Sequence, residues 1–491
     1  MSTRRGASSS GRAGFAPRGG RGGRGDRGSG GRGGGRGGRS APQRQAPPPQ
    51  PDIFKHPLGN LVAKITTKDI DLTASNGTLS AAAAITECEY VASYNWMNDS
   101  TSTIMAPGKP PLWTPLSVPH QLNEDAGDFY RDPNAARFPS YPIEPAVQAI
   151  FKVDAAFSTS NIDVFTCGST LGNLLRFVRN DDKLFHFTVE LIGNTVFFLR
   201  KEGSPTELIT GVRGFGHTFP EAYTTWEPDV KGSETHQRMV QYKFGGLRFI
   251  LRFECDGYFN PALPQKSSYE EEDDDLAQAL KAVSVSQSLP KQNNSLKIKT
   301  GGSEVPQSSI FDLKTRSGKY SQSIDMEQIL PLLYLKQIPN FIVAYHNGAG
   351  LFPTKDIKVE NFEKKIRQWE IDNKSALERL SVLLHKIIEI VKTDECGLLE
   401  IYRPSPDYLE IRKQHGDESH VLPLSLRQEW EAAGRHVADE FDSDQASSQE
   451  GEGVGLPRDY YSYDFDSDSE DDRDFTACSA DDCGYCGRCT Y

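Results

Sequence analysis

The stretch LRFILRFECD, residues 247–256, alternates apolar and polar side chains along an extended chain. Successive side chains of a β-strand point to opposite faces, so the Leu and Phe residues of this stretch would pack into a core while the other face ends in acid. Glu254 and Asp256 are two residues apart and share that second face. Two carboxylates in this arrangement can share a divalent cation. The stretch therefore predicts a half-buried strand with a metal-binding end.

A second acidic strand is predicted at residues 310–315, IFDLKT, where Asp312 and Lys314 repeat the same spacing. Acids that hold Mg²⁺ or Mn²⁺, beside a lysine that stabilises developing negative charge, are what metal-assisted phosphodiester cleavage requires. Either motif alone is more typical of solvated acids at strand ends. The order in which the two motifs follow each other, with a helix and another strand after them, favours the catalytic interpretation.

The remaining patterns predict an α+β fold in which flanking helices cover a mixed β-sheet. Alternation over residues 185–199, interrupted at Gly193-Asn194, predicts a hairpin, and residues 376–392 have the apolar spacing of an amphipathic helix. We expect the folded core to span residues 53–430. Within it, the polar and acidic residues 260–308 predict a mobile insertion.

The series of motifs resembles the DXO-type decapping exoribonucleases, a branch of the PD-(D/E)XK nuclease superfamily, over residues 85–413. GHTFPEAYTTW is similar to the family's G-Y-x-F-E element, which implies that Glu221 is the first metal-facing acid. FILRFECDGY resembles its E-x-D strand, with Glu254 and Asp256 as metal ligands. SIFDLKTRSGKY resembles its E-L-K-T-S strand, with Asp312 as a metal ligand and Lys314 as the catalytic lysine.

The resemblance also implies a catalytic Gln on the helix after the lysine strand, for which Gln328 is the candidate. It implies a nuclease-like fold, Mg²⁺ or Mn²⁺ as cofactor, and RNA as substrate. The implied reaction is hydrolysis at the RNA 5′ end, by decapping, release of pyrophosphate or 5′-to-3′ trimming, with a place in mRNA processing.

One departure from the family leaves a second hypothesis open. The family has a strand with a Trp-Arg-Gly or Ala-Arg-Gly element whose Arg meets the RNA 5′ end, whereas the matching strand here reads FTCGSTLGNLLRF without an Arg at that point. The alternative is a catalytically inactive RNA-binding or partner-activating protein on the same scaffold. The order of the motifs makes the hydrolase the first hypothesis.

A third alternative is a prenyl diphosphate synthase. Fungal sequences with stretches such as YRDPNAARFPSYP are often labelled geranylgeranyl pyrophosphate synthetase. Such enzymes resemble all-helical bundles with two D-D-x-x-D motifs. Neither acidic run of this chain, residues 270–275 and 470–474, has that spacing on a core helix, so the sequence does not support the label.

The two ends of the chain differ sharply in composition. Residues 1–52 form an Arg/Gly-rich and Pro-rich arm, predicted to be disordered, whose R-G-G repeats favour RNA binding through phosphate contacts and stacking; protein docking is an alternative. Residues 431–474 are predicted to be an acidic, disordered tail that can serve as a further site for protein partners. Residues 475–491 hold a cluster whose spacing favours a zinc site over an iron–sulfur cluster or free thiols, formed by Cys478, Cys483, Cys486 and Cys489.

Composition predicts a protein that stays inside the cell. The formal net charge is -12, although the N-terminal arm is basic. No apolar run approaches the roughly 20 residues that span a bilayer, and the N-terminus lacks the apolar stretch of a secretory signal. The other four Cys residues are scattered rather than arranged as a disulfide scaffold. We expect the nucleus, the cytoplasm or both, and no membrane partner.

Overall fold

The computed structural model of this chain describes residues 57–71, 83–181, 183–201, 204–209, 212–260, 295–318, 324–416 and 418–441. The predictions made for the N-terminal arm, the tail after residue 441 and the four C-terminal cysteines fall outside the described residues. Within them, no helix is long and apolar enough to cross a membrane.

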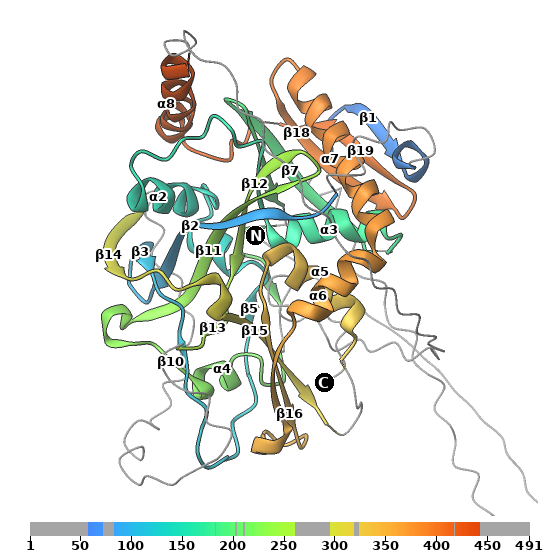
Figure 1. Cartoon of the computed structure of the whole chain (residues 1–491). Helices are drawn as coiled ribbons and strands as arrows, with labels where there is room; N and C mark the ends of the chain where they lie inside the picture. The colour runs from blue at the N-terminus through green and yellow to red at the C-terminus, as the bar shows by residue number, and fades with distance from the viewer. Residues whose placement is uncertain are drawn as a thin grey trace, which may run out of the picture. The chain divides into compact units, whose positions relative to one another are not determined.

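Among the described residues, the larger sheet has eleven strands that run in mixed directions (Figure 1). Its middle strand β6 pairs in parallel with β8 and β12, and most other neighbours are antiparallel. From one edge to the other, the strands are β1 (Leu61–Thr66), β19 (Tyr408–Lys413), β18 (Leu398–Ser405), β7 (Phe185–Ile192), β8 (Thr195–Arg200), β6 (Val164–Cys167), β12 (Leu247–Glu254), β11 (Ser233–Phe244), β2 (Thr86–Met97), β3 (Thr103–Gly108) and β14 (Lys297–Gly302).

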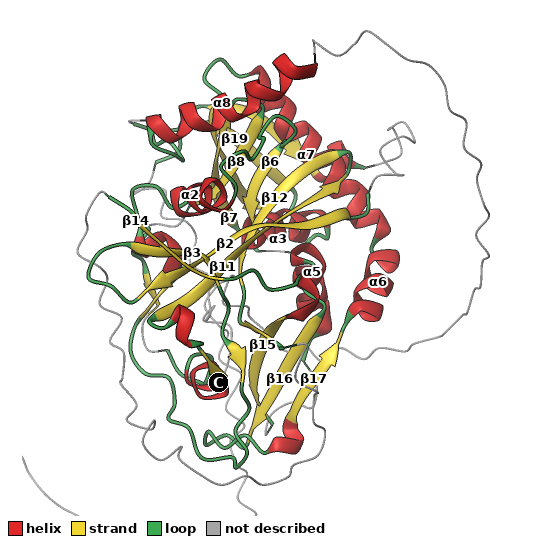
Figure 2. Cartoon of the chain, turned by 60° about the vertical axis from the view of Figure 1, so that its left-hand side comes forward, coloured by secondary structure: helices red, strands yellow, loops and turns green. Residues whose placement is uncertain are grey.

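Helices cover both faces of the larger sheet because alternate side chains of its strands supply two apolar cores. On β12, Phe249, Leu251 and Phe253 enter the core beneath α3, α5, α6 and α7, whereas Ile250 enters the core beneath α2 and α8. Figures 1 and 2 place these two sets of helices on opposite sides of the sheet. The helices are α2 (Glu144–Val153), α3 (Gly168–Val178), α5 (Met326–Lys336), α6 (Glu363–Asp372), α7 (Lys374–Thr393) and α8 (Leu424–Phe441).

A second sheet of six strands begins where β12 leaves the larger sheet. After Glu254 the chain passes through Cys255 and Asp256 directly into β13. In order, the strands are β10 (Thr224–Thr225), β4 (Leu112–Trp113), β13 (Gly257–Tyr258), β15 (Ile310–Ser317), β16 (Asn340–His346) and β17 (Ile357–Asn361). The short elements β5 (Phe129–Tyr130), β9 (Leu208–Ile209), α1 (Pro133–Arg137) and α4 (Thr218–Tyr223) complete the described fold.

The sequence patterns predicted most of these elements. The α+β class, a mixed sheet with flanking helices, is confirmed, and the hairpin β7–β8, the strand β15 and the helix α7 lie where they were expected. Long, strongly periodic segments are the easiest to identify because their apolar side chains all face one core. A strand-rich core also rules out the all-helical bundle of a prenyl diphosphate synthase for the described residues.

Three sequence expectations need correction. FTCGSTLGNLLRF is a strand only as far as Cys167 and continues as α3, in which Gly168 and Gly172 are tolerated where the helix packs against Lys336 and Leu332. Residues 297–302, expected in the insertion, form β14, which pairs in parallel with the edge strand β3. The helix α8 continues past the expected core boundary at residue 430 to Phe441, anchored by the buried ring of Trp430.

Candidate active site

A cluster of buried charged groups lies where the two sheets meet. Asp256 is in the link between β12 and β13, and its Oδ2 accepts a hydrogen bond of 2.6 Å from the backbone N–H of Leu313 on β15. A side chain at the next residue, Gly257, would overlap the ring of Phe311 and the carbonyl of Pro111. The glycine therefore allows β13 to approach β15 closely enough to set Asp256 beside Asp312.

Asp312 is the centre of the cluster. Its Oδ1 lies 3.4 Å from Nζ of Lys314 on the same strand, and its Oδ2 lies 3.3 Å from Nζ of Lys336 at the end of α5. The side chain of Lys336 is 2% exposed and that of Asp312 is 8% exposed, so this ion pair is almost wholly removed from water. We call Asp256, Asp312, Lys314 and Lys336 the acid–lysine cluster.

The pKa values of the two carboxyl groups of the cluster are shifted in opposite directions. Burial raises the pKa of Asp256 well above its usual range, and the adjacent negative charge of Asp312 raises it further. Burial also acts to raise the pKa of Asp312, but the ammonium groups of Lys314 and Lys336 outweigh it, so that the pKa of Asp312 lies below its usual range. The pair therefore holds one proton on Asp256 over a range of pH in which a solvated Asp would be ionised.

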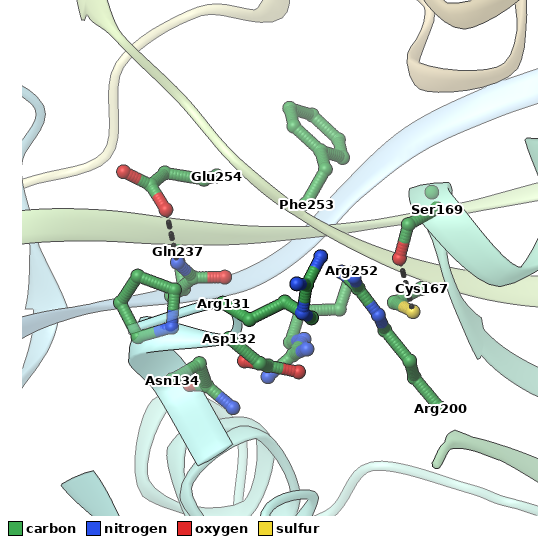
Figure 3. Close-up of a pocket in the computed structure, with 12 residues that line it drawn as sticks. Arg131, Asp132, Asn134, Cys167, Ser169, Arg200, Gln237, Arg252, Phe253 and Glu254 are labelled. Atoms are coloured by element: carbon green, nitrogen blue, oxygen red, sulfur yellow. Dashed lines mark hydrogen bonds between the residues drawn. The ribbon is translucent and has the colours of Figure 1, made fainter. Parts of the chain in front are cut away.

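The side chain of Glu254 lines a hollow that is also lined by Asn134 of α1 (Figure 3). Its Oε2 accepts a hydrogen bond of 3.3 Å from Nε2 of Gln237, the residue opposite it on β11. Glu254 is only two residues from Asp256 in the chain. Its side chain nevertheless lies at the edge of a hollow rather than in the acid–lysine cluster.

Glu221 lies on α4, on the other side of β15 from the cluster. The helix packs through Phe219 and Tyr223 against Phe311 and Leu313, which alternate with Asp312 and Lys314 along β15. Glu221 is exposed, yet desolvation by the surrounding protein, followed by the negative charge of Asp125, raises its pKa. Among the described residues, no hydrogen bond or ion pair joins Glu221 to the cluster.

The helix α5 contributes Lys336 to the cluster, a residue that the sequence pattern did not indicate. Gln328 is exposed in the first turn, where its Nε2 donates to Oδ2 of Asp325 at 3.2 Å. Lys336, which contacts Asp312, is eight residues further on, roughly 12 Å along the helix axis. The structure therefore replaces Gln328 by Lys336 as the α5 residue of the site.

The carboxyl groups of the cluster supply part of the ligand set that a divalent cation requires. Two of the four expected acids, Asp256 and Asp312, come together, and their pairing retains a proton that a divalent ion would displace. No group of three or more Asp, Glu, His or Cys side chains gathers closely enough to hold an ion in the described part of the chain. Carboxylate oxygens are the ligands that Mg²⁺ and Mn²⁺ prefer, and Glu254 is the nearest further acid along the chain.

The hollow beside Glu254 contains residues that the sequence analysis missed. It encloses about 390 Å³, including space open to solvent, and its lining includes Arg131, Arg200 and Arg252. Figure 3 shows these three side chains between Glu254 and Gln237 on one side and Cys167 and Ser169 on the other. They come from three distant segments, so no local motif announces them. The alternation of β12, which puts Arg252 on the same face as Glu254, was the one available signal.

The fold and this site define an α+β protein whose two mixed sheets meet at a buried acid–lysine cluster, with an arginine-lined hollow beside it. Residues 62–406 match the family model described as "Domain of unknown function (DUF8563)", and the chain belongs to this family. No curated protein matches this chain.

Several solved structures of Rai1 and Dxo1 proteins, which are DXO-family decapping exonucleases, are similar to this chain. S. pombe Rai1 in complex with 3′-FADP has 11% identity and a TM-score of 0.45, covering 71% of this chain and 98% of that one. Scheffersomyces stipitis Rai1 in complex with (3′-NADP)⁺ and calcium ion has 10% identity and a TM-score of 0.46, covering 73% and 100%. K. lactis Dxo1 in complex with manganese has 8% identity and a TM-score of 0.38, covering 76% and 98%. Because these TM-scores are below 0.5, we base the roles of residues on this chain's own contacts.

Proposed function

We propose that this chain is a metal-dependent hydrolase that acts at the 5′ end of RNA. The observation that carries the proposal is the buried pair of Asp256 and Asp312, with Nζ of Lys314 3.4 Å from Asp312. The two residues lie in the two segments whose sequences resemble the E-x-D and lysine motifs of DXO-type nucleases. Burial of two carboxyl groups at a sheet junction costs desolvation free energy. A role in packing alone does not explain why these two positions hold acids.

Asp256 and Asp312 would hold the ion, with Glu254 as a further donor from the edge of the hollow. The bound ion would polarise a phosphoryl oxygen and activate water. Lys314 is placed to stabilise negative charge that develops on the phosphoryl group, because its ammonium group lies beside the carboxylate that would face the ion. Lys336 keeps Asp312 ionised from the side of α5, and is a positioning residue in this scheme.

The test is incubation of the purified full chain with 5′-triphosphate, capped and 5′-monophosphate RNAs in Mg²⁺ or Mn²⁺. We expect release of 5′ products from at least one RNA class. Asp312→Asn and Lys314→Met should each lower this turnover by about 100-fold or more, since Asp312 would hold the ion and Lys314 would stabilise charge on the phosphoryl group. The products identify whether the enzyme removes a cap, releases pyrophosphate or trims the chain.

A matched control for these variants is the exposed ion pair of Asp99 and Lys299, whose atoms lie 2.7 Å apart at the edge of the larger sheet. Asp99→Asn and Lys299→Met change the same residue types away from the cluster and should leave turnover unchanged. Metal-independent turnover, or turnover that survives Asp312→Asn in a folded variant, would contradict the proposal.

A second candidate function is RNA binding without catalysis. The observation that favours it is Lys336, because its ammonium group, together with that of Lys314, compensates the negative charge of Asp312 without an ion. In that case no RNA is turned over in either metal, yet RNA still binds to the full chain. The same incubation followed by a binding measurement separates the two functions.

The ends of the chain extend either function. We propose that the R-G-G repeats of residues 18–39 bind RNA and that the C-terminal cysteines bind Zn²⁺. Deletion of the arm should weaken RNA binding most strongly at low salt, because phosphate contacts are salt-dependent. Elemental analysis of the full chain should give about one zinc per molecule, lost when Cys483 and Cys486 are replaced by Ser.

A further inference from the structure

The hollow beside Glu254 concentrates positive charge on one spot. Arg131, Arg200 and Arg252 line it, against the carboxylates of Asp132 and Glu254. Both carboxylates accept hydrogen bonds from elsewhere, since Asp132 caps α1 through the N–H of Ala135 at 2.9 Å and Glu254 accepts from Gln237. Arg131 is also paired with Glu207 at 2.9 Å. An anion between the guanidinium groups of Arg200 and Arg252 would reduce the repulsion between those two groups.

Arg252 has an unused donor in this region. Its Nη1 is buried, and no acceptor for it is found among the residues that the structure describes. A buried polar atom without a partner costs free energy, so such atoms are uncommon unless they bind a ligand or water. Arg200 reaches the same space from the end of β8.

The helix α3 adds a third feature, because it begins at the edge of the hollow. Gly168 and Ser169, its first two residues, line the hollow. The side chain of the N-cap residue Cys167 does not cap the backbone amides of the first turn, because its Sγ contacts the hydroxyl groups of Ser169 and Thr170 at 3.2 and 3.1 Å. The first turn also holds no acidic residue. The first amides of an eleven-residue helix and its dipole therefore favour an anion at this place.

The hollow is next to the acid–lysine cluster. A Cβ atom at Gly168 would lie 3.4 Å from Cε of Lys336, whose Nζ contacts Asp312. Glu254 bounds the hollow on its other side, two residues before Asp256. An anion in the hollow would therefore lie beside the groups that we propose for catalysis.

We propose that this hollow, with Arg200, Arg252 and the first turn of α3, binds the terminal 5′-phosphate of an RNA substrate. The proposal rests on the proposed function for its choice of RNA as the carrier of the phosphoryl group. A guanidinium group and a phosphate form charge-assisted, often bidentate hydrogen bonds, and a terminal phosphate carries more charge and more free oxygens than an internal phosphodiester. The hollow supplies arginine from residues outside the family's Trp-Arg-Gly element, which this chain lacks.

The test compares two RNAs of one sequence, one with a 5′-phosphate and one with a 5′-hydroxyl, bound to the full chain in EDTA and followed by fluorescence anisotropy. Internal phosphates and contacts to the arm are the same for both, so their ratio of affinities reports the terminal group alone. We expect the 5′-phosphate to bind about tenfold more tightly, about 1.4 kcal/mol. Inorganic phosphate at matched ionic strength should abolish this preference and leave binding of the 5′-hydroxyl RNA unchanged.

Arg200→Gln and Arg252→Lys should each reduce the preference to about twofold or less. The glutamine removes the positive charge, and the lysine keeps the charge but cannot form the bidentate contact. Arg248→Gln is the matched control: it lies on β12 with Arg252, but its guanidinium faces Glu87 outside the hollow. Melting temperatures identify a variant that fails to fold, and Arg200→Gln at the strand end provides the decision if Arg252→Lys is unstable.

Equal binding of the two RNAs by the unmodified chain, or a preference that survives both substitutions, would overturn this inference. Turnover without a 5′-phosphate preference refutes the pocket and leaves the hydrolase. A preference without turnover on any RNA supports the pocket and refutes the hydrolase instead. A further outcome is that inorganic phosphate raises the melting temperature of the chain while the two RNAs bind equally. That result would show that the hollow binds free phosphate only, and it would also refute the inference.

Discussion

The acid–lysine cluster and the arginine-lined hollow are neighbours, yet they handle charge in opposite ways. In the cluster, two carboxyl groups and two ammonium groups lie within contact of one another and are nearly excluded from water. In the hollow, Arg131 is paired with Glu207, whereas Nη1 of Arg252 has no acceptor among the described residues. The charged groups of the cluster compensate one another within the protein, whereas the hollow is the place where we propose that an anion binds.

This difference separates what each region contributes to stability from what it contributes to binding. Breaking a buried ion pair leaves an uncompensated charge and destabilises the fold. Removing one of several like charges from an open hollow relieves repulsion and changes chiefly what can bind there. Variants in the two regions, and in matched exposed pairs, test this contrast.

The largest effect is expected at the centre of the cluster. Asp312→Asn removes the partner of Lys314 and of Lys336, and should lower the free energy of unfolding by about 3–5 kcal/mol. Urea titration measures this change. The exposed pair of Glu360 and Lys365 is the comparison, because Glu360→Gln should cost less than about 1 kcal/mol. Equal losses for the two variants would show that the cluster does not behave as a buried site.

Divalent metal should stabilise the folded chain through the acid pair. In protein freed of metal, addition of Mn²⁺ to a hundred times its dissociation constant should raise the free energy of unfolding by about 2.7 kcal/mol, because the ion binds the folded state. Differential scanning calorimetry detects this as a higher melting temperature. Asp256→Asn should remove the response, and a response that persists in this variant would place the ion elsewhere.

Stability without metal should depend on pH through Asp256. Because the folded pKa of Asp256 lies above the unfolded value of about 3.9, the unfolded chain loses this proton first as the pH rises. Stability should therefore fall from about pH 4 up to the folded pKa, by at most about 1.4 kcal/mol per pH unit. Asp312, with its lowered pKa, loses its contribution only below about pH 4.

Urea titrations in EDTA at about pH 5 and about pH 7 measure this effect. Asp256→Asn cannot ionise and should show a flatter dependence than the unmodified chain. A variant with the same slope would mean that another group titrates in this range, and that the proton on Asp256 does not control stability there.

The smallest change in stability is expected at the edge of the hollow. Glu254→Gln keeps the shape of the side chain and loses one hydrogen bond of 3.3 Å to Gln237, so it should cost less than about 1 kcal/mol. Turnover should nevertheless fall, since Glu254 is the proposed third metal donor. A loss of stability like that of Asp312→Asn would place Glu254 in the buried cluster rather than at its edge.

The sequence predicted the strand pair well because one principle governs both strands. Alternation placed Glu254 on one face of β12, and it placed Asp312 and Lys314 together on one face of β15. Asp256 lies beyond the end of β12, where strand alternation no longer determines the position of its side chain. Alternation could not show that the two carboxyl groups would meet, because that contact depends on the junction at Gly257 between two sheets.

The residues that the sequence missed depend on approach between distant segments. Lys336 looks like an ordinary solvated lysine at the end of a helix, and only the packing of α5 against β15 shows that it is buried beside Asp312. Glu221, chosen by resemblance, lies on a helix that packs on the other face of β15. Arg131, Arg200 and Arg252 meet through three elements that no local motif connects.

The hydrogen bond between Asp256 and Leu313 joins two parts of the chain that lie on opposite sides of residues 261–294. Two separate polypeptides, ending and beginning within that segment, would each carry one carboxylate of the pair. Their association would have to form the pairings of β13 with β15 and of β14 with β3 between the two pieces. Activity would then appear only on complementation of the fragments, which makes the site a direct reporter of assembly.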